Sequence, residues 1–466
     1  MTSATSQPSL KRQLGLIPAA AVVVGEVIAV GIFLTPAEMS KSIGSPAIVA
    51  GVWLVIGAMS TMGALCFGEL AARYPEAGGG YIYLREAFGP RIAFLYGWKC
   101  FLVLDPGLTA ALAVGLAGYL SYIVRLTQFE AKLVAIGVIL GVALANVFGV
   151  RFGALLTESL TLLKLGTLIF LAGWALGLQR GDWSHFEPLV QQRPGSASLS
   201  IAIGGGLMSA FFAFGGWWDV SKLGGEVKDP RRTLPRALIL GILTVTLVYL
   251  ATSAVFLYLV PVERVTSGET FAAQAGAALF GPIGGLVLSC IVIVSVLGSM
   301  AAMMMAAPRV YYAMARDGLF LSAAAVPHPR FGTPIYAIGL QAAVASVLVV
   351  SGTFGQIVAY FIFVTVAFVA LTVAGLFVLR KKHQAPLSYR TPGYPATAII
   401  FVALMFLLLI VLAARNPAQA LIGAGVVVVG AFVYPWTVRR ANSGYTPPSA
   451  TVDGEALGAE ATPGLD

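Results

Sequence analysis

The chain has 466 residues, of which 58% are hydrophobic and only 11% are charged, and its formal net charge is +9. A soluble globular protein carries roughly 25% charged residues, so this composition excludes an ordinary soluble enzyme or binding domain. The basic residues lie between long apolar runs, which favours a membrane protein over a nucleic-acid-binding protein. Apolar runs of about 20 residues favour membrane-spanning helices over the short alternating segments of a β-barrel.

In chain order, the apolar runs predict an all-α integral membrane protein with about twelve transmembrane helices. These lie near residues 16–41, 46–71, 92–123, 131–149, 153–178, 200–223, 235–260, 283–314, 333–352, 356–380, 396–414 and 418–438. A short amphipathic helix, 268–279, is expected between the seventh and eighth spans. The transporter domain is therefore 16–438, between a polar segment, 1–15, and a cytoplasmic tail, 439–466. The tail is rich in small and acidic residues, so we expect it to be disordered, and we expect no cleavable signal peptide.

The distribution of lysine and arginine predicts the orientation. With the N-terminus in the cytoplasm, 20 of the 29 basic residues fall on the cytoplasmic side and seven on the outer side, while Lys99 and Lys164 fall within spans. This asymmetry follows the positive-inside rule. We therefore expect a multi-pass protein of the cell (inner) membrane with both termini in the cytoplasm.

Two spans, the first and the sixth, contain a glycine-rich interruption near mid-depth, at 25–33 and 211–219. Glycine destabilises a helix interior by about 1 kcal/mol relative to alanine, and unwound backbone can hold a carboxylate or a cation. Because the broken spans are five apart and the loops reverse sidedness, we predict an inverted 5+5 repeat. Its halves would be about 16–178 and 200–380, followed by two extra helices at 396–438. Close helix packing is the alternative explanation for these glycines.

Several charged residues lie inside predicted spans, where a charge costs at least about 2.5–3.5 kcal/mol. Lys164 is far from either end of the fifth span. Glu26 follows Gly25 in the first break, and Asp105 precedes a proline within the third span, so we expect both acids to serve in binding or coupling. Asp219 follows the second break, where capping of the resumed helix explains it equally well.

Five groups of residues, in this order and spacing, resemble the amino acid–polyamine–organocation (APC) superfamily, and within it the L-type amino acid transporter branch. They are Gly31-Ile32-Phe33-Leu34-Thr35-Pro36; Gly68-Glu69-Leu70 with Tyr74-Pro75-Glu76-Ala77-Gly78-Gly79; Phe212-Ala213-Phe214-Gly215-Gly216-Trp217; Glu226-Val227-Lys228-Asp229-Pro230 with Leu234-Pro235-Arg236-Ala237; and Ala315-Arg316-Asp317-Gly318. The resemblance implies a LeuT-type fold and amino acid transport by alternating access. Members include obligatory exchangers and proton-coupled importers, so both modes stay open.

The same resemblance implies which residues bind the substrate. Its carboxylate would contact N–H groups of the first break, and its ammonium would contact carbonyl groups of both breaks, with Phe212 closing over it as an aromatic gate. The implied substrate-binding residues are Ile28, Ala29, Val30, Gly31, Asp105, Phe212, Ala213, Phe214, Gly215 and Trp217. Ala29, Val30 and Trp218 depart from the smaller or more polar residues of the family, so the substrate stays open.

By resemblance, the ammonium of Lys164 occupies the place where related sodium-coupled transporters bind a sodium ion. It would contact the carbonyl oxygens of Gly25 and Ile28 and a hydroxyl of Ser295 or Ser299. Lys164 would then act either as a permanent tether or as a titrating proton carrier, with Glu26 as a second coupling residue. Sodium coupling is not expected. The inner loop with Glu69, Arg73 and Glu76 is expected to close the cytoplasmic side through charge pairs.

A secondary transporter of amino acids, by exchange or proton coupling, is the favoured function. A carrier of polyamines or other organic cations is the alternative, because of Glu26, Asp105 and Asp219. An intramembrane enzyme and a channel are disfavoured, because the three histidines fall in predicted loops and no selectivity motif is visible.

We expect an amino acid substrate and the lipid bilayer as partners, with protons as a further partner if transport is proton-coupled, but no cofactor, no metal and no nucleic acid. Cys66, Cys100 and Cys290 all lie in apolar runs, where buried packing is expected. No predicted outer loop contains a cysteine, so no disulfide-linked partner subunit is expected.

Overall fold

The computed structural model describes residues 10–29, 31–264, 268–351, 354–382, 387–415 and 417–442. Their regular secondary structure is helical, apart from two isolated bridges, Leu14–Val227 and Ala77–Leu223, which confirms the all-α class. In the described residues, ten helical spans are long and apolar enough to cross a membrane, and a pair bent by 48° brings the number to eleven. A shorter apolar helix matches the ninth predicted span. Each predicted span therefore has a helical counterpart.

The helices of the first half are α1 (Leu16–Val27), α2 (Gly31–Ile43), α3 (Pro46–Arg73), α4 (Gly80–Phe88), α5 (Pro90–Lys99), α6 (Asp105–Ile123), α7 (Gln128–Val147) and α8 (Val150–Gly177). Those of the second half are α9 (Leu199–Ala213), α10 (Pro230–Leu259), α11 (Gly268–Phe280), α12 (Gly284–Ala306), α13 (Pro308–Arg316), α14 (Ile335–Ser351) and α15 (Phe354–Lys382). Two further helices follow, α16 (Ala396–Arg415) and α17 (Pro417–Asn442). The predicted short helix after the seventh span is α11.

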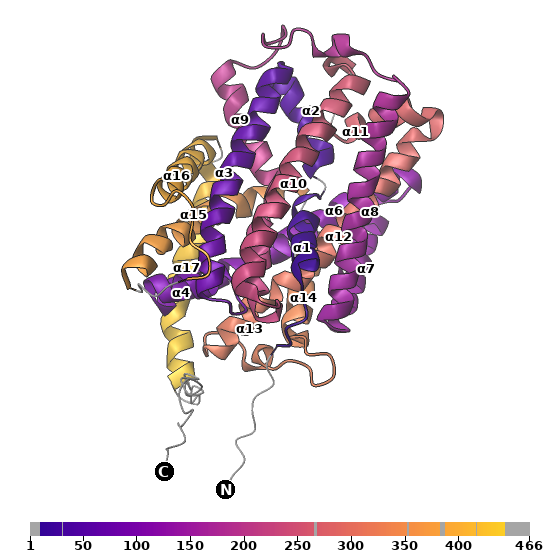
Figure 1. Ribbon diagram of the computed structural model, residues 1–466. Helices are drawn as coiled ribbons and strands as arrows, with labels where there is room; N and C mark the ends of the chain where they lie inside the picture. The colour runs from indigo at the N-terminus through magenta and orange to yellow at the C-terminus, as the bar shows by residue number, and fades with distance from the viewer. Residues whose placement is uncertain are drawn as a thin grey trace, which may run out of the picture.

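The two glycine-rich interruptions lie next to each other inside the bundle. Helix α1 ends at Val27 and α2 starts at Gly31, so α2 stands above α1 in Figure 1. Helix α9 ends at Ala213 and is followed by a 3₁₀ segment, Trp217–Lys222. Because α2 packs against α9 and α1 packs against the 3₁₀ segment, the two breaks face each other.

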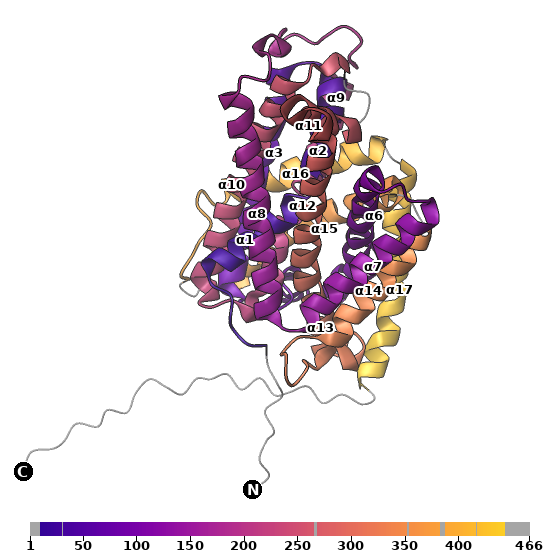
Figure 2. The same ribbon diagram turned by 90° about the vertical axis from the view of Figure 1, so that its right-hand side faces the viewer.

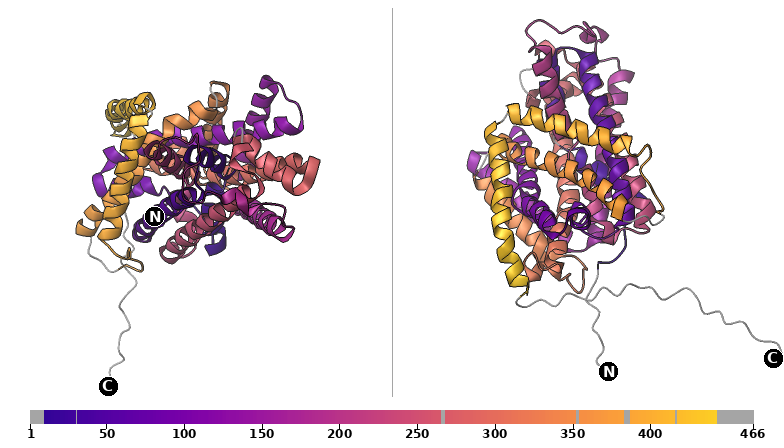
Figure 3. Two further views of the ribbon diagram at one scale, coloured as in Figure 1. Left: turned by 90° about the horizontal axis from the view of Figure 1, so that it is seen from above. Right: turned by 90° about the vertical axis from the view of Figure 1, so that its left-hand side faces the viewer.

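The remaining helices surround these broken spans. Helices α6, α7 and α14 pack against one another and form one flank in Figure 2. Helices α15, α16 and α17 are in mutual contact and cover the outside of another flank in Figure 3. The first described residues and the end of α17 lie at the same end of the molecule (Figure 1), which agrees with termini on one side of a membrane.

The third predicted span is continuous but irregular. Helices α5 and α6 are joined by a π-helical turn, Cys100–Leu104, in which the N–H group of Asp105 donates to the carbonyl of Cys100, five residues earlier. Pro106 has no N–H group and cannot make the usual bond to the fourth residue before it, which favours an irregular turn at this point. The turn places Asp105 at the start of α6.

Charge pairs cluster at the end of the bundle where α4 and α13 lie. The buried carboxylate of Glu69 accepts hydrogen bonds from Arg380 Nε at 2.9 Å and from Arg73 Nη2 at 3.3 Å. Arg85 holds Asp317 through two bonds of 2.9 and 3.0 Å. Burial alone would lower the pKa of the Arg85 guanidinium, but Asp317 outweighs burial and raises it above its usual value. The Arg380–Glu69 and Arg85–Asp317 pairs join segments distant in sequence, as the expected closure of this side requires.

Two basic residues that the sequence analysis assigned to the cytoplasmic loops are buried instead. Lys222 has no exposed surface, and Arg309 is 1% exposed and pairs with Glu226 through Nε at 2.7 Å. A buried cation needs an anion or several oxygen acceptors inside the protein, and hydropathy alone does not show that such partners are near. The expectation for the cysteines is also wrong in part, since Cys66 and Cys100 are buried but Cys290 is exposed.

Candidate substrate-binding site

A cavity of about 50 Å³ lies between the two broken spans. Its lining from the breaks is Glu26, Val27, Ala29, Gly31, Phe211, Phe212, Ala213, Gly215, Gly216, Trp218 and Asp219. The opposite wall consists of Leu104 from the π-helical turn that precedes α6, Leu108 and Leu112 from α6, Met303 from α12, and Ile362 and Thr365 from α15. The cavity therefore joins unwound backbone and two carboxylates on one side to a mainly apolar wall on the other.

Glycine is required at two positions because the breaks approach each other closely. A Cβ atom on Gly31 would lie 3.0 Å from Cα of Ala213, tighter than normal packing allows. Gly216 has φ +104°, a conformation that other residues rarely adopt, and a Cβ atom there would lie 3.4 Å from Oε2 of Glu26. These glycines thus serve both unwinding and close packing, so the two explanations raised from the sequence apply together.

Lys164 connects α8 to the first break through hydrogen bonds. Its Nζ, on a side chain that is 1% exposed, donates to the carbonyl oxygens of Gly25 at 2.7 Å and Ile28 at 2.6 Å. It also contacts Ser299 Oγ at 3.1 Å and the carbonyl of Ser295 at 3.4 Å, both on α12. These are the contacts expected from the sequence, and they join three helices through one ammonium group.

Tyr249, on α10, connects the two breaks, and the sequence analysis missed it. Its hydroxyl lies 2.7 Å from the carbonyl oxygen of Val27 and 2.8 Å from that of Ala213. A phenol has one hydrogen, so it can bond only one of these oxygens fully at a time. A buried tyrosine within an apolar span needs a polar partner for its hydroxyl group. The presence of a tyrosine in this span was the only feature of the sequence that pointed to such a contact.

The carbonyl groups proposed to hold the substrate ammonium each face a hydrogen-bond donor of the protein. The oxygen of Ile28 accepts from Lys164 and from the hydroxyls of Ser295 at 3.1 Å and Ser299 at 3.0 Å. The oxygen of Phe212 accepts from the N–H of Gly215 at 3.0 Å, and that of Ala213 faces Tyr249. Ile28 does not line the cavity, because its carbonyl points to Lys164 and α12, and its assignment to substrate binding stays a prediction.

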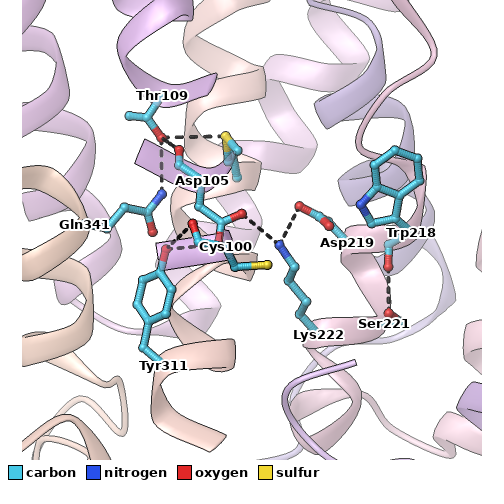
Figure 4. A network of polar contacts seen from close by, with 10 residues as sticks. Cys100, Asp105, Thr109, Trp218, Asp219, Ser221, Lys222, Tyr311 and Gln341 are labelled. Atoms are coloured by element: carbon cyan, nitrogen blue, oxygen red, sulfur yellow. Dashed lines mark hydrogen bonds and ion pairs between the residues drawn. The ribbon is translucent and has the colours of Figure 1, made fainter. Parts of the chain in front are cut away.

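A second polar network lies beneath the cavity and is drawn in Figure 4. The Nζ of Lys222 contacts Asp219 Oδ2 at 2.8 Å and Asp105 Oδ1 at 3.1 Å. The other oxygen of Asp105 accepts from the hydroxyl of Tyr311 at 2.9 Å. All four side chains are at most 4% exposed, so two buried carboxylates share one buried ammonium. Asp219 therefore pairs with a lysine and does not cap the 3₁₀ segment through its side chain.

The structure places the predicted site residues in several different positions. Six of them line the cavity: Glu26, Ala29, Gly31, Phe212, Ala213 and Gly215. Asp105 is turned toward Lys222 and Tyr311, and Phe214 and Trp217 pack outward, Phe214 on Trp53 and Trp217 on Phe67. Gly25, Lys164, Ser295 and Ser299 form the network behind the first break. Val30 lies outside the described residues.

Four lining residues of the second break were not among the predicted binding residues: Phe211, Gly216, Trp218 and Asp219. Asp219 and Lys222 are three residues apart, a spacing at which opposite charges meet on a helical turn, and this signal could have found the pair. Within the described part of the chain, histidine, cysteine and acidic side chains form no group of three that could hold a metal ion.

The chain is similar to known proteins over most of its length, including the residues of this site. Residues 14–434 match the family model described as "Amino acid permease". That match extends from the first described bridge to the last helix and includes both breaks, Lys164 and the Lys222 network.

Individual relatives that match most of the chain are also named as amino acid transporters or exchangers. The chain is 30% identical over 410 residues to the "Serine/threonine exchanger SteT" of Bacillus subtilis (strain 168), covering 87% of this chain and 92% of that protein. It is 28% identical over 389 residues to the human "b(0,+)-type amino acid transporter 1", covering 81% of this chain and 79% of that protein. It is also 28% identical over 439 residues to the human "Large neutral amino acids transporter small subunit 2", covering 91% and 80%.

Proposed function

We propose that this chain, which belongs to the amino acid permease family, transports amino acids by exchanging one for another and without sodium. The chain is a multi-pass membrane protein, and amino acid transport by alternating access is the activity of its family and relatives. The observation that carries the proposal is the cavity between the two breaks, with Lys164 fixed beside it.

The geometry around Lys164 favours exchange over proton coupling. Its ammonium is within 3.4 Å of four oxygen atoms, and its two shortest contacts are to carbonyl groups of the first break. A neutral amine could donate at most two of these hydrogen bonds, so the charged form fits the site as a permanent tether. A tether that stays in place leaves no room for a coupling ion, and one relative is named an exchanger.

The wall of the cavity supports substrates with uncharged side chains. Leu104, Leu108 and Met303 offer no partner to a second charge, and a buried charge without a partner is strongly destabilising. We further propose that the protein lies in the cytoplasmic membrane with both ends of the chain inside. It would act without a catalytic step, a cofactor, or a disulfide-linked subunit.

The test is an uptake assay in proteoliposomes with a panel of radiolabelled amino acids. We expect uptake to rise by about tenfold or more when the lumen holds an unlabelled amino acid, because an exchanger returns to the outward-facing state only when loaded. An inward proton gradient or external sodium should add nothing. Uptake into empty liposomes driven by the proton gradient would contradict exchange, and uptake of a polyamine in place of any amino acid would contradict the substrate class.

A further inference from the structure

A second, larger cavity lies at the end of the molecule where the described chain begins. Its volume is about 670 Å³, and its walls come from the segment before α1, the start of α1, the first turns of α8 and the segment before α10. The segments before α1 and α10 are joined by the Leu14–Val227 bridge, and α1 packs against α8. The cavity is therefore built from parts of the chain that hold one another in place, and it shares no lining residue with the cavity between the breaks.

Three charged side chains line this second cavity without meeting one another. They are the side chains of Arg12 and Lys228, which are exposed, and of Glu158, which is half-buried. Among the residues that the structure describes, none of these three side chains makes an ion pair or a hydrogen bond. Charges of opposite sign that share a cavity but do not touch leave room for a ligand that carries both a negative and a positive group.

The cavity lies where α8 enters the bilayer. With a rise of about 1.5 Å per residue, Glu158 lies about 12 Å along α8 from its first residue, Val150. A carboxylate at this depth of a span needs a partner. Leu155, which lines the cavity, is 60% exposed, and Ile17, next to the lining residue Pro18, is 65% exposed. The rim is therefore apolar on the side of the bilayer, and it can contact acyl chains while the cavity holds a polar group.

We propose that this cavity binds the head group of a phospholipid that carries a phosphate and a primary ammonium group, as phosphatidylethanolamine does. Arg12 and Lys228 hold the phosphate, because guanidinium and ammonium groups form strong hydrogen bonds to phosphate oxygens and basic pockets between membrane helices bind lipid head groups. Glu158 accepts hydrogen bonds from the ammonium. A purely anionic head group would leave Glu158 unpaired, and a soluble ligand would leave the apolar rim uncovered. This site does not depend on which substrate the protein transports.

The test measures the unfolding temperature of the purified full-length protein in detergent, with and without added lipid. Three lipids with the same acyl chains are compared: phosphatidylethanolamine, phosphatidylcholine and phosphatidylglycerol. We expect phosphatidylethanolamine to raise the unfolding temperature by about 3 °C at a hundred times its dissociation constant. The other two should give less than about half of this shift, because the nitrogen of phosphatidylcholine has no N–H group and phosphatidylglycerol has no ammonium.

Four variants separate the roles of the charges. Glu158→Gln should abolish the preference, so that phosphatidylethanolamine and phosphatidylglycerol give equal shifts. Arg12→Met and Lys228→Met should each reduce the shift from all three lipids by about half or more, because each removes a phosphate partner. The matched control is Lys11→Met, an exposed lysine that does not line the cavity, which should keep the wild-type shifts. Without added lipid, every variant should unfold at the wild-type temperature, because the three lining side chains have no partner in the described protein.

Four results would overturn the site. Equal shifts from phosphatidylethanolamine and phosphatidylglycerol in the wild type would mean that Glu158 does not bind the ammonium. The wild-type preference in Glu158→Gln would mean that lipid elsewhere on the protein causes the shift. A full shift from soluble phosphoethanolamine would identify a soluble ligand in place of a lipid. A shift that appeared only in a chain lacking residues 2–9 would mean that the start of the chain itself fills the cavity.

Discussion

Replacement of Lys164 by methionine is expected to lower amino acid exchange by at least about a hundredfold. Methionine keeps the length and apolar character of the side chain but removes the ammonium that bonds Gly25, Ile28 and Ser299. Hydrogen bonds to a charged group contribute about 1.5–3 kcal/mol each, and every 1.4 kcal/mol corresponds to a factor of ten. The first break would lose its hydrogen bonds to the Lys164 ammonium of α8, so the cavity would no longer be held in one shape.

The measurement is counterflow of a labelled amino acid in proteoliposomes, with the amount of folded protein checked by gel filtration. The matched control is Lys11→Met, because Lys11 is an exposed lysine near the start of the chain. A second variant, Ser299→Ala, removes one hydroxyl partner and should cause a smaller loss of exchange. Wild-type exchange by a folded Lys164→Met protein would show that the ammonium is dispensable.

Replacement of Lys222 by methionine is expected to destabilise the fold by about 3–5 kcal/mol. The substitution would leave Asp105 and Asp219 buried next to each other without a counter-charge. Breaking a buried ion pair by removing one partner has an effect of this size, because the remaining charge is neither solvated nor paired. The variant should unfold at a markedly lower temperature than the wild type.

Thermal unfolding in detergent can be followed with a thiol-reactive dye, because Cys66 and Cys100 are buried in the folded protein. Cys290 is exposed and would react before unfolding, so the measurement is made in a Cys290→Ser background. The matched control is Lys228→Met, which removes an exposed lysine six residues further along. The triple variant D105N/D219N/K222M should recover much of the loss, because it leaves no unpaired charge. Equal stability of the single variant and the wild type would mean that Lys222 does not balance these acids.

The positions of the spans could be predicted because they depend on a local property, whereas the contacts of Lys164 were implied by the resemblance to the APC superfamily and have a simple physical reason. Span positions follow from runs of apolar residues, which the bilayer requires regardless of tertiary structure. Lys164 stands in the middle of such a run, so it has to find oxygen atoms inside the protein, and the unwound first break offers carbonyl groups at that depth. The roles of the predicted site residues remain predictions that the experiments above can decide.

The partners of the other buried charges could not be predicted, because they depend on distant residues. Lys222 lies near the end of a predicted span, so the sequence alone favours a position on the cytoplasmic side. Its second partner, Asp105, is 117 positions away in the sequence. Arg309 and Glu226 are 83 positions apart. Tyr249 gives no charge signal at all, and its contacts with Val27 and Ala213 exist only once α10 packs against α1.

The π-helical turn at Cys100–Leu104 makes the third span sensitive to insertions and deletions. An α-helix turns by about 100° per residue, so the additional residue in this turn rotates α5 relative to α6 by about that angle. Asp105 faces Lys222 only because this extra residue is present. Losing one residue between Lys99 and Asp105 would leave a regular helix of almost the same length whose two halves face different neighbours. In related chains, a change of length in this turn would therefore alter the buried network more than most single substitutions in it.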